Sequence, residues 1–503
     1  MRLPRVADAA LVGAAKLAAS LAVVTRYFFA ISDDDFARIV IAQRFAERPQ
    51  LDPSGTSWLP VPFWIYGTAF RLLGSSLAVA QGVAVFLGVG AALLLLRAAH
   101  LLGAGRTGAL LGALLAALFP WSVYLGAAAV PEAPTAALCV FGTATLAVDA
   151  RRERLFGAVA LAAACFSRYE AWPVAAAFAA FTLLDERRTR DRYAVLPAVL
   201  ALGPVALWLL HGVFIHGDAL FFWKRVAAYK LALGKPPPLA ERIGEVPRWL
   251  FLNEPELSIG LLVALIAYPA QLRRYRRPAA AALALLAFLA AGEIGGGGPT
   301  HHAERAVLPI WFLLALALGD VIGQSFETRP RWLSSGVPVL SSAVWRYAAL
   351  AYPVLLVLLG WHYFALKRSN RDFAGRGYEL AAGARARELG APALLIDTGD
   401  YGYFAVIAAF RKPNAAVPFD DHDPRHPHPY PFSSVDALKA VWARYPNAWL
   451  AMSLTGSGRT VALRAGTVRE SGWFTLIAPG PPTELNDESA GTRSVYPRSH
   501  HYK

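Results

Sequence analysis

The chain has 503 residues, 56% of them hydrophobic, and a formal net charge of +14. Its mean hydropathy is +0.40. It contains repeated apolar runs close to the roughly 20 residues with which a helix crosses a bilayer. These properties exclude an ordinary soluble protein. The basic residues gather in short loops between the apolar runs, as a topology signal does, so the positive charge does not indicate a nucleic-acid partner.

Eleven apolar segments predict a polytopic, mostly α-helical transmembrane bundle. The first is too long for a signal-peptide core, so we expect a retained helix in which Lys16 and Arg26 snorkel. Residues 155–184 contain the polar stretch SRYEAWP and are interpreted as two short helices. The segments are residues 8–31, 75–97, 106–128, 131–150, 155–168, 170–184, 193–215, 257–272, 278–293, 303–323 and 346–365.

The arginine-rich loops set the orientation, because cytoplasmic loops carry an excess of Lys and Arg. Placing these loops inside puts the N-terminus in the cytoplasm and the chain after residue 368 outside. High Ala, Leu, Arg and Pro content is typical of a GC-rich bacterial genome. We therefore expect a multi-pass protein of a bacterial plasma (inner) membrane, in contact with membrane lipids.

The stretch FFAISDDDFARIV places Asp33, Asp34 and Asp35 where the first segment leaves the membrane. One aspartate suffices to cap a helix. Three adjacent like charges repel one another, which favours a proton acceptor or a cation site. DDFARIVIAQRFAE and SWLPVPFWIYGTAF follow and predict outer interfacial helices.

Further polar clusters lie in the loops that this topology places outside. They are Glu132 in VPEAP, Arg168 and Glu170 in SRYE, and the stretch GGGGPTHHAER with His301, His302 and Arg305. Each has a structural alternative: a carboxylate in a first helical turn, an internal ion pair, or interfacial histidines. The glycines permit a tight loop or close approach to a ligand. WKRVAAYK, residues 223–230, fits lipid headgroups or a donor phosphate equally.

Residues 368–482 predict a small extracytoplasmic α/β domain after the transmembrane domain of residues 1–367. ALLID, AWLAMSL and TVALRAG are interpreted as strands, and SVDALKAVWARY as a helix with Ser433 and Ser434 as N-cap candidates. The Pro- and His-rich stretch 420–431 is interpreted as a solvated loop rather than a metal site. Residues 483–503 predict a disordered tail.

The acidic cluster after the first span, the long outer loop, Glu132, SRYE and HHAER together resemble the GT-C superfamily of integral-membrane glycosyltransferases. The similarity is greatest to the branch of protein O-mannosyltransferases and the lipid A aminoarabinose transferase, and it covers roughly residues 8–365. The C-terminal domain matches no family known to us. The triplet DDD departs from the commoner Asp-Glu or Asp-Asp pair, which leaves open which aspartate is the key one.

This resemblance implies an inverting sugar transfer from a polyprenyl-phosphate donor to a glycan, lipid or protein acceptor on the extracytoplasmic face. It implies Asp33, Asp34 and Glu132 as catalytic residues, with Asp33 and Asp34 also candidate ligands of Mg²⁺ or Mn²⁺. Asp35 is the candidate for capping the next helix. The residues implied in substrate binding are Asp35, Arg168, Glu170, His301, His302 and Arg305.

Two other functions fit a polytopic membrane protein. A secondary transporter places ionisable residues near the bilayer midplane, in broken helices and often in internal repeats. Here the acidic residues lie at loop boundaries on one side, and the sequence shows no repeat. A non-catalytic sensor or scaffold with an outer ligand-binding domain does not account for the separate polar clusters.

Overall fold

The computed structural model describes residues 4–189, 195–267, 271–299, 302–327, 342–367, 373, 375–426, 434–453 and 459–481. The chain forms two compact units. The first comprises residues 1–29, 54–62 and 82–369, and the second comprises residues 30–53, 63–81 and 370–503, in each case as far as they are described. Each unit is treated by itself below.

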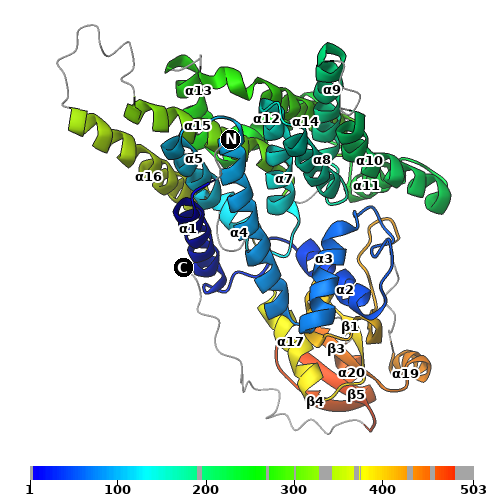
Figure 1. Cartoon of the computed structure of the whole chain (residues 1–503). Coiled ribbons are helices and arrows are strands. Elements are labelled where there is room, and N and C mark those ends of the chain that lie inside the picture. Colours follow the sequence, from blue (N-terminus) through cyan, green and yellow to red (C-terminus); the bar gives the residue numbers. More distant parts are fainter. Residues whose placement is uncertain are drawn as a thin grey trace. The chain divides into compact units, whose positions relative to one another are not determined.

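The first unit is helical (Figure 1). Each of the eleven predicted segments overlaps a helix, and residues 155–184 form two helices, α8 and α9, as predicted. The helices are α1 (Val6–Val24), α4 (Leu77–Leu101), α5 (Arg106–Leu118), α6 (Pro120–Leu125), α7 (Glu132–Ala144), α8 (Arg151–Cys165), α9 (Ala171–Thr189), α10 (Val195–His216), α11 (Phe221–Leu233), α12 (Leu239–Asn253), α13 (Pro255–Ala267), α14 (Arg276–Ile294), α15 (Leu308–Glu327) and α16 (Ser342–Lys367).

Five stretches of helix among the described residues are long and apolar enough to cross a membrane. They are Val6–Val24, Leu77–Leu101, Val195–His216, Arg273–Ile294 and Ala303–Gln324. Three shorter apolar helices accompany them, at Arg106–Leu118, Ala171–Asp185 and Ala351–Lys367. These helices establish a multi-pass membrane architecture, whereas the count of eleven spans stays a prediction.

Helices α5 and α15 approach each other through glycines. A Cβ added to Gly112 would lie 3.0 Å from the Cα of Leu316, and one added to Gly108 would lie 2.9 Å from the Cα of Asp320. On α15, a Cβ on Gly319 or Gly323 would meet the backbone of α5. Small residues at such a crossing allow two backbones to pack closely, which drives helix association in lipid.

Lys16 of α1 does not snorkel, contrary to the expectation. Its side chain is buried, and its ammonium donates to the carbonyl of Ala117 at 3.2 Å and to that of Ser122 at 2.6 Å. Both carbonyls lie near the break between α5 and α6, where Pro120 interrupts the helix. The lysine therefore satisfies the carbonyl of Ala117, which the break deprives of a helical donor, and adds a bond to the carbonyl of Ser122, which also accepts from the amide of Gly126.

The second unit contains a five-stranded sheet in the order β2-β1-β3-β5-β4. β1 pairs in parallel with β2 and β3, and β5 pairs antiparallel with β3 and β4. The elements are α2 (Asp33–Glu47), α3 (Val61–Leu73), α17 (Gly377–Glu388), β1 (Ala393–Asp397), α18 (Tyr403–Phe410), β2 (Ala416–Pro418), α19 (Val435–Arg444), β3 (Ala448–Ser453), α20 (Arg459–Ala465), β4 (Gly466–Glu470) and β5 (Phe474–Pro479).

Side chains from strands and helices form one core of this unit. Leu395, Leu450 and Ile477 of the sheet pack with Leu438 and Trp442 of α19. Ser434 caps α19, and its hydroxyl accepts from the amide of Ala437 at 3.2 Å, as the sequence predicts. Ser433 lies outside the described residues.

Helices α2 and α3, from the N-terminal part of the chain, lie beside the C-terminal elements (Figure 1). The side-chain amide of Gln43 on α2 donates to the carbonyl of Ala408 on α18 at 2.9 Å. The apolar residues Phe36, Ile39 and Val40 are buried. The apolar face that predicted a helix lying on lipid thus packs within the protein.

Two predictions for the C-terminal part need correction or restriction. TVALRAG is not a strand, because Arg459–Ala465 form helix α20 and the strand β4 follows it. Short apolar runs do not distinguish a buried strand from a buried helix.

In the Pro- and His-rich stretch, residues 420–426 form turns in which Asp420 accepts from the amide of His422 at 2.7 Å. Residues 427–431 and the tail from 482 onward lie outside the described residues.

Candidate functional site

The three aspartates open helix α2, but Asp35 has a structural task. Its carboxylate accepts from the amide of Ile31 at 2.6 Å and from the hydroxyl of Ser32 at 3.3 Å, and the side chain is buried. Arg38 lies 3.8 Å from it. The carboxylate thus ties the first turn of α2 to the residue before its N-cap, Ser32. The predicted roles of Asp35 in capping α2 and in binding substrate stay predictions.

Asp33 is held by an arginine that the sequence analysis missed. Both carboxylate oxygens of Asp33 accept from Arg376, each at 2.7 Å. Burial lowers the pKa of Arg376, but the hydrogen bond and charge of Asp33 outweigh it, so this pKa lies above its ordinary value. The pair is therefore charged and bidentate, which is the strongest geometry available to an Arg–carboxylate contact.

Asp34 differs from both neighbours. It is half-buried, and among the described residues it makes no hydrogen bond or ion pair. A carboxylate without an internal partner can accept a proton or a hydrogen bond from an incoming molecule. Of the three aspartates, Asp34 is the one whose surroundings suit general-base chemistry.

In the first unit, four charged residues form a continuous network. Arg168 donates to Glu132 at 2.5 Å and, with two nitrogens, to Glu170 at 2.5 and 3.2 Å. Arg305 lies 3.4 Å from the same oxygen of Glu132. Glu132, Glu170 and Arg305 are buried, so the charges compensate one another in a poorly solvated place. The structure thus brings together four residues that the sequence selected from three separate loops.

His302 belongs to the same loop as Arg305. Its carbonyl accepts from Nε of Arg305 at 3.2 Å, and its φ of 53° places it in the left-handed region. Its ring lies 3.6 Å from the carboxylate of Glu304. The loop therefore orients the guanidinium of Arg305 by backbone contact. His301 lies outside the described residues, so its predicted role stays a prediction.

The glycine-rich stretch before His302 makes room for a tryptophan. A Cβ added to Gly297 would lie 2.5 Å from the indole of Trp223, and one added to Gly295 would lie 2.7 Å from it. On the same helix, α11, Lys230 pairs with Glu293 at 3.1 Å. These glycines thus allow the loop backbone to lie directly against the indole of Trp223 on α11.

The turn that carries Arg168 and Glu170 is fixed by aromatic packing. The hydroxyl of Tyr169 donates to the carbonyl of Ser57 at 2.7 Å and accepts from the indole of Trp208 at 3.0 Å. Its ring stacks on Phe222 at 4.2 Å. The two residues on either side of Tyr169 therefore project from a rigid support.

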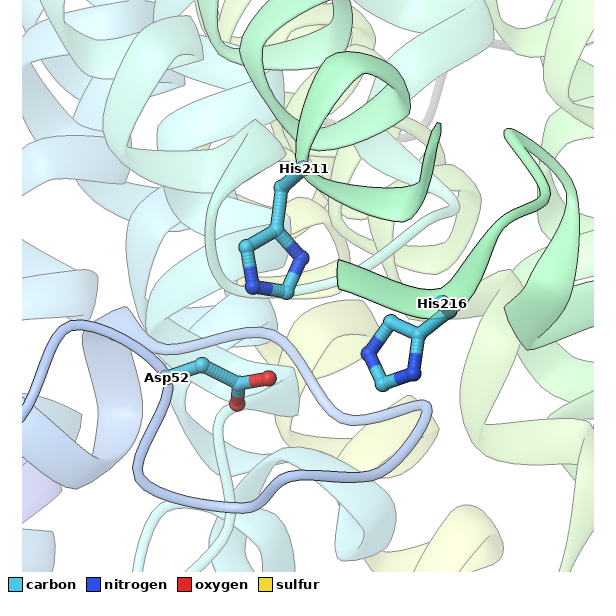
Figure 2. Close-up of side chains that lie close together, drawn as sticks. All are labelled: Asp52, His211 and His216. Carbon is cyan, nitrogen blue, oxygen red and sulfur yellow. The ribbon is translucent and has the colours of Figure 1, made fainter. Parts of the chain in front are cut away.

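The aromatic group continues to two histidines at the end of α10. His211 stacks on Trp208 at 4.6 Å, and the rings of His211 and His216 lie 5.5 Å apart (Figure 2). His216 in turn stacks on Phe221, at 3.9 Å. The sequence analysis did not single out this grouping, although its members lie close together in the sequence.

Two kinds of chemistry are available in these arrangements. Asp34 offers a proton acceptor at the start of a helix in the second unit. Arg168 and Arg305 both contact Glu132 in the first unit, and guanidinium groups can bind a phosphate through planar, charge-assisted hydrogen bonds. Arg376 was missed because the stretch around it carries no motif that points to a site.

Residues 53–211 match the family model described as dolichyl-phosphate-mannose-protein mannosyltransferase. The structure is similar to the crystal structure of ArnT from Cupriavidus metallidurans bound to undecaprenyl phosphate. The TM-score is 0.60 and the identity 15%, over 95% of this chain and 98% of that one. The apo structure of ArnT gives a TM-score of 0.53 at 15% identity, over 89% and 94% of the two chains. No curated protein matches the chain.

These comparisons confirm the resemblance on which the sequence-based prediction rests. The structural similarity shows that the chain has the fold of ArnT. The family match covers the region that contains Glu132, Arg168 and Glu170. Together they agree with the predicted resemblance: residues 53–211 match a mannosyltransferase family model, and the chain has the fold of ArnT.

Proposed function

We propose that this protein transfers a sugar from a polyprenyl-phosphate donor to an acceptor hydroxyl on the extracytoplasmic side of a bacterial inner membrane. Asp34 takes the proton from the acceptor hydroxyl as its oxygen attacks the anomeric carbon. The bond from that carbon to the phosphate oxygen breaks, and polyprenyl phosphate leaves with the electron pair. A single displacement of this kind inverts the anomeric centre.

The observation that carries this proposal is the contrast within the triplet. Asp33 is bound by Arg376 and Asp35 accepts from the amide of Ile31, whereas Asp34 makes no hydrogen bond or ion pair among the described residues. A general base must reach its substrate rather than a neighbouring side chain. This assigns the base to Asp34 and leaves Asp33 in a supporting role.

The leaving phosphate is assigned to Arg168 and Arg305. Glu132 contacts both guanidinium groups and so holds them around one point. Arginine stabilises phosphate through planar, charge-assisted hydrogen bonds. Glu132 thus acts by positioning the two arginines, and Glu170 fixes Arg168 from its other side. The undecaprenyl phosphate in the similar ArnT structure supports a polyprenyl-phosphate ligand of this class.

A divalent cation is not needed for this mechanism. Both oxygens of Asp33 already accept from Arg376, so a cation at Asp33 and Asp34 would have to displace that guanidinium. Asp34 alone provides one carboxylate, whereas Mg²⁺ and Mn²⁺ prefer several oxygen ligands. The donor set therefore fits Mg²⁺ or Mn²⁺ poorly, and the arginines supply the positive charge.

The test is a transfer assay with the purified full-length protein in nanodiscs. Radiolabelled sugars on undecaprenyl phosphate are offered as donors with membrane glycolipid extracts as acceptors, and release of undecaprenyl phosphate is measured. We expect acceptor-dependent release in the presence of EDTA. An absence of transfer with every donor, for protein that still binds undecaprenyl phosphate, would contradict the proposal.

A further inference from the structure

Arg376 connects three separate parts of the second unit. Besides its bidentate contact with Asp33 at the start of α2, its Nη1 lies 3.2 Å from Glu379 on α17. The same nitrogen donates to Asp400, in the turn that follows β1, at 3.0 Å. One guanidinium thus joins the first turn of the helix with the aspartates to the carboxyl end of a central strand.

The backbone is shaped to admit this guanidinium. A Cβ added to Gly402 would lie 3.1 Å from Nη1 of Arg376 and 3.0 Å from the carboxylates of both Glu379 and Asp400. The φ of Gly402 is −58°, which any residue adopts, so conformation does not require glycine here. A methyl group here would press on three charged side-chain ends, each of which would have to shift by a few tenths of an ångström.

The surroundings give this connection strength. The side chain of Arg376 is 19% exposed, and those of Asp33 and Glu379 are 25% and 17% exposed. Three carboxylates share one guanidinium, so the contact is charge-assisted at every point and partly shielded from water. The planar guanidinium has several N–H donors and can donate to three carboxylates at once. A lysine ammonium cannot reproduce this geometry.

We propose that Arg376 is a positioning residue for sugar transfer: by tying Asp33 to the turn after β1, it fixes the first turn of α2 and thereby aims the neighbouring carboxylate of Asp34. This inference rests on the proposed role of Asp34 as the base. Arg376 acts through Asp33 and does not touch the substrate. The small C-terminal sheet thus contributes to catalysis through a single ionic connection.

The experiment compares kcat and KM in the full-length protein for four variants: Arg376→Gln, Arg376→Lys, Gly402→Ala and Arg385→Gln. We expect Arg376→Gln to lower kcat by up to about 10²-fold with little change in KM, since a misaimed base costs rate rather than binding. Arg376→Lys should recover part of the rate. Gly402→Ala keeps every charge and should also lower kcat, because it displaces the guanidinium.

Arg385→Gln is the matched control. Arg385 lies on the same helix, α17, and pairs with Glu470 at 3.2 Å instead of with the triplet. Its substitution removes an ion pair of the second unit without touching Asp33, and kcat should stay at the wild-type value. Thermal unfolding of all variants separates a loss of rate from a loss of folded protein.

A double-mutant cycle tests the route through Asp33. If Arg376 acts by holding Asp33, the double variant Asp33→Asn with Arg376→Gln should be no slower than the slower single variant. Wild-type kcat in Arg376→Gln and Gly402→Ala, alongside an inactive Asp34→Asn, would overturn the positioning role and leave the proposed function standing. An active Asp34→Asn would instead overturn the assignment of the base.

Discussion

Asp33, Asp34 and Asp35 are chemically identical side chains whose environments set them apart. The sequence could single out the triplet because three adjacent carboxylates at a membrane boundary are costly. It could not rank them with certainty, because the partner of Asp33 is Arg376, 343 residues further along the chain. Likewise, four members of the Glu132 network were found from their loops, but their mutual contacts needed the fold.

The first prediction separates the three aspartates by substitution with asparagine. Asp34→Asn should lower kcat by about 10²–10⁴-fold, because asparagine keeps the size but cannot accept the proton. Asp35→Asn should change the rate little, since asparagine caps a helix about as well as aspartate. The measurement is sugar transfer at matched amounts of folded protein. Near-normal turnover in all three variants would show that the carboxylates are structural.

The second prediction concerns a terminal and an inner member of the Glu132 network. Arg305→Ala removes a terminal member and leaves Glu132 paired with Arg168, so the protein should fold while its affinity for undecaprenyl phosphate falls. Glu132→Gln leaves the buried guanidinium of Arg305 and the partly buried one of Arg168 around a neutral amide. Losing one partner of a buried pair costs about 3–5 kcal/mol of stability.

The readouts are binding of undecaprenyl phosphate by calorimetry and thermal unfolding in nanodiscs. Arg248→Ala is the control, because its side chain is exposed and pairs with Glu245 on the same helix, α12. Unchanged affinity in Arg305→Ala would remove this arginine from the site. A Glu132→Gln variant as stable as the wild type would show that the network tolerates an uncompensated charge.

At the scale of elements, the helix crossing of α5 and α15 gives the third prediction. Gly112→Ala places a methyl group 3.0 Å from the Cα of Leu316, and the facing backbone cannot move aside like a flexible side chain. Overpacking of this kind costs about 1–3 kcal/mol. The control is Gly90→Ala on α4, where nothing lies within 4 Å. The melting temperature in detergent should fall for Gly112→Ala and stay at the wild-type value for Gly90→Ala. Equal melting temperatures for the two variants would contradict the close crossing.

The elements also show where sequence patterns stop being informative. Long apolar runs predicted helices correctly because length and composition alone decide them. TVALRAG was misassigned as a strand because seven residues are too few for periodicity to separate strand from helix. The sequence predicted that α2 has an apolar face, but not which part of the protein packs against the helix. Helix α18, more than 350 residues away in the chain, is one of the elements in contact with α2.

At the scale of the whole molecule, the sequence predicted a multi-pass, mostly helical membrane architecture, and the structure has the fold of ArnT. It predicted a boundary near residue 368, whereas the compact second unit also includes residues 30–53 and 63–81. A boundary drawn along the chain cannot anticipate such a unit, because contacts between distant segments define it. Orientation in the membrane depends on the loop charges and is open to direct test.

The last prediction is that topology. With eleven spans and the arginine-rich loops inside, Lys439 on α19 should face the outside of the membrane and Asp149 the cytoplasm. Both residues are exposed, so a cysteine at either would be reachable from its own side. The two native cysteines, Cys139 and Cys165, are buried and can be replaced by serine to give a silent background. A membrane-impermeant maleimide applied to intact spheroplasts should label Lys439→Cys at once and Asp149→Cys only after permeabilisation. The reverse pattern would invert the protein in the membrane, and labelling of both at once would mean that the number of spans between them is even rather than odd.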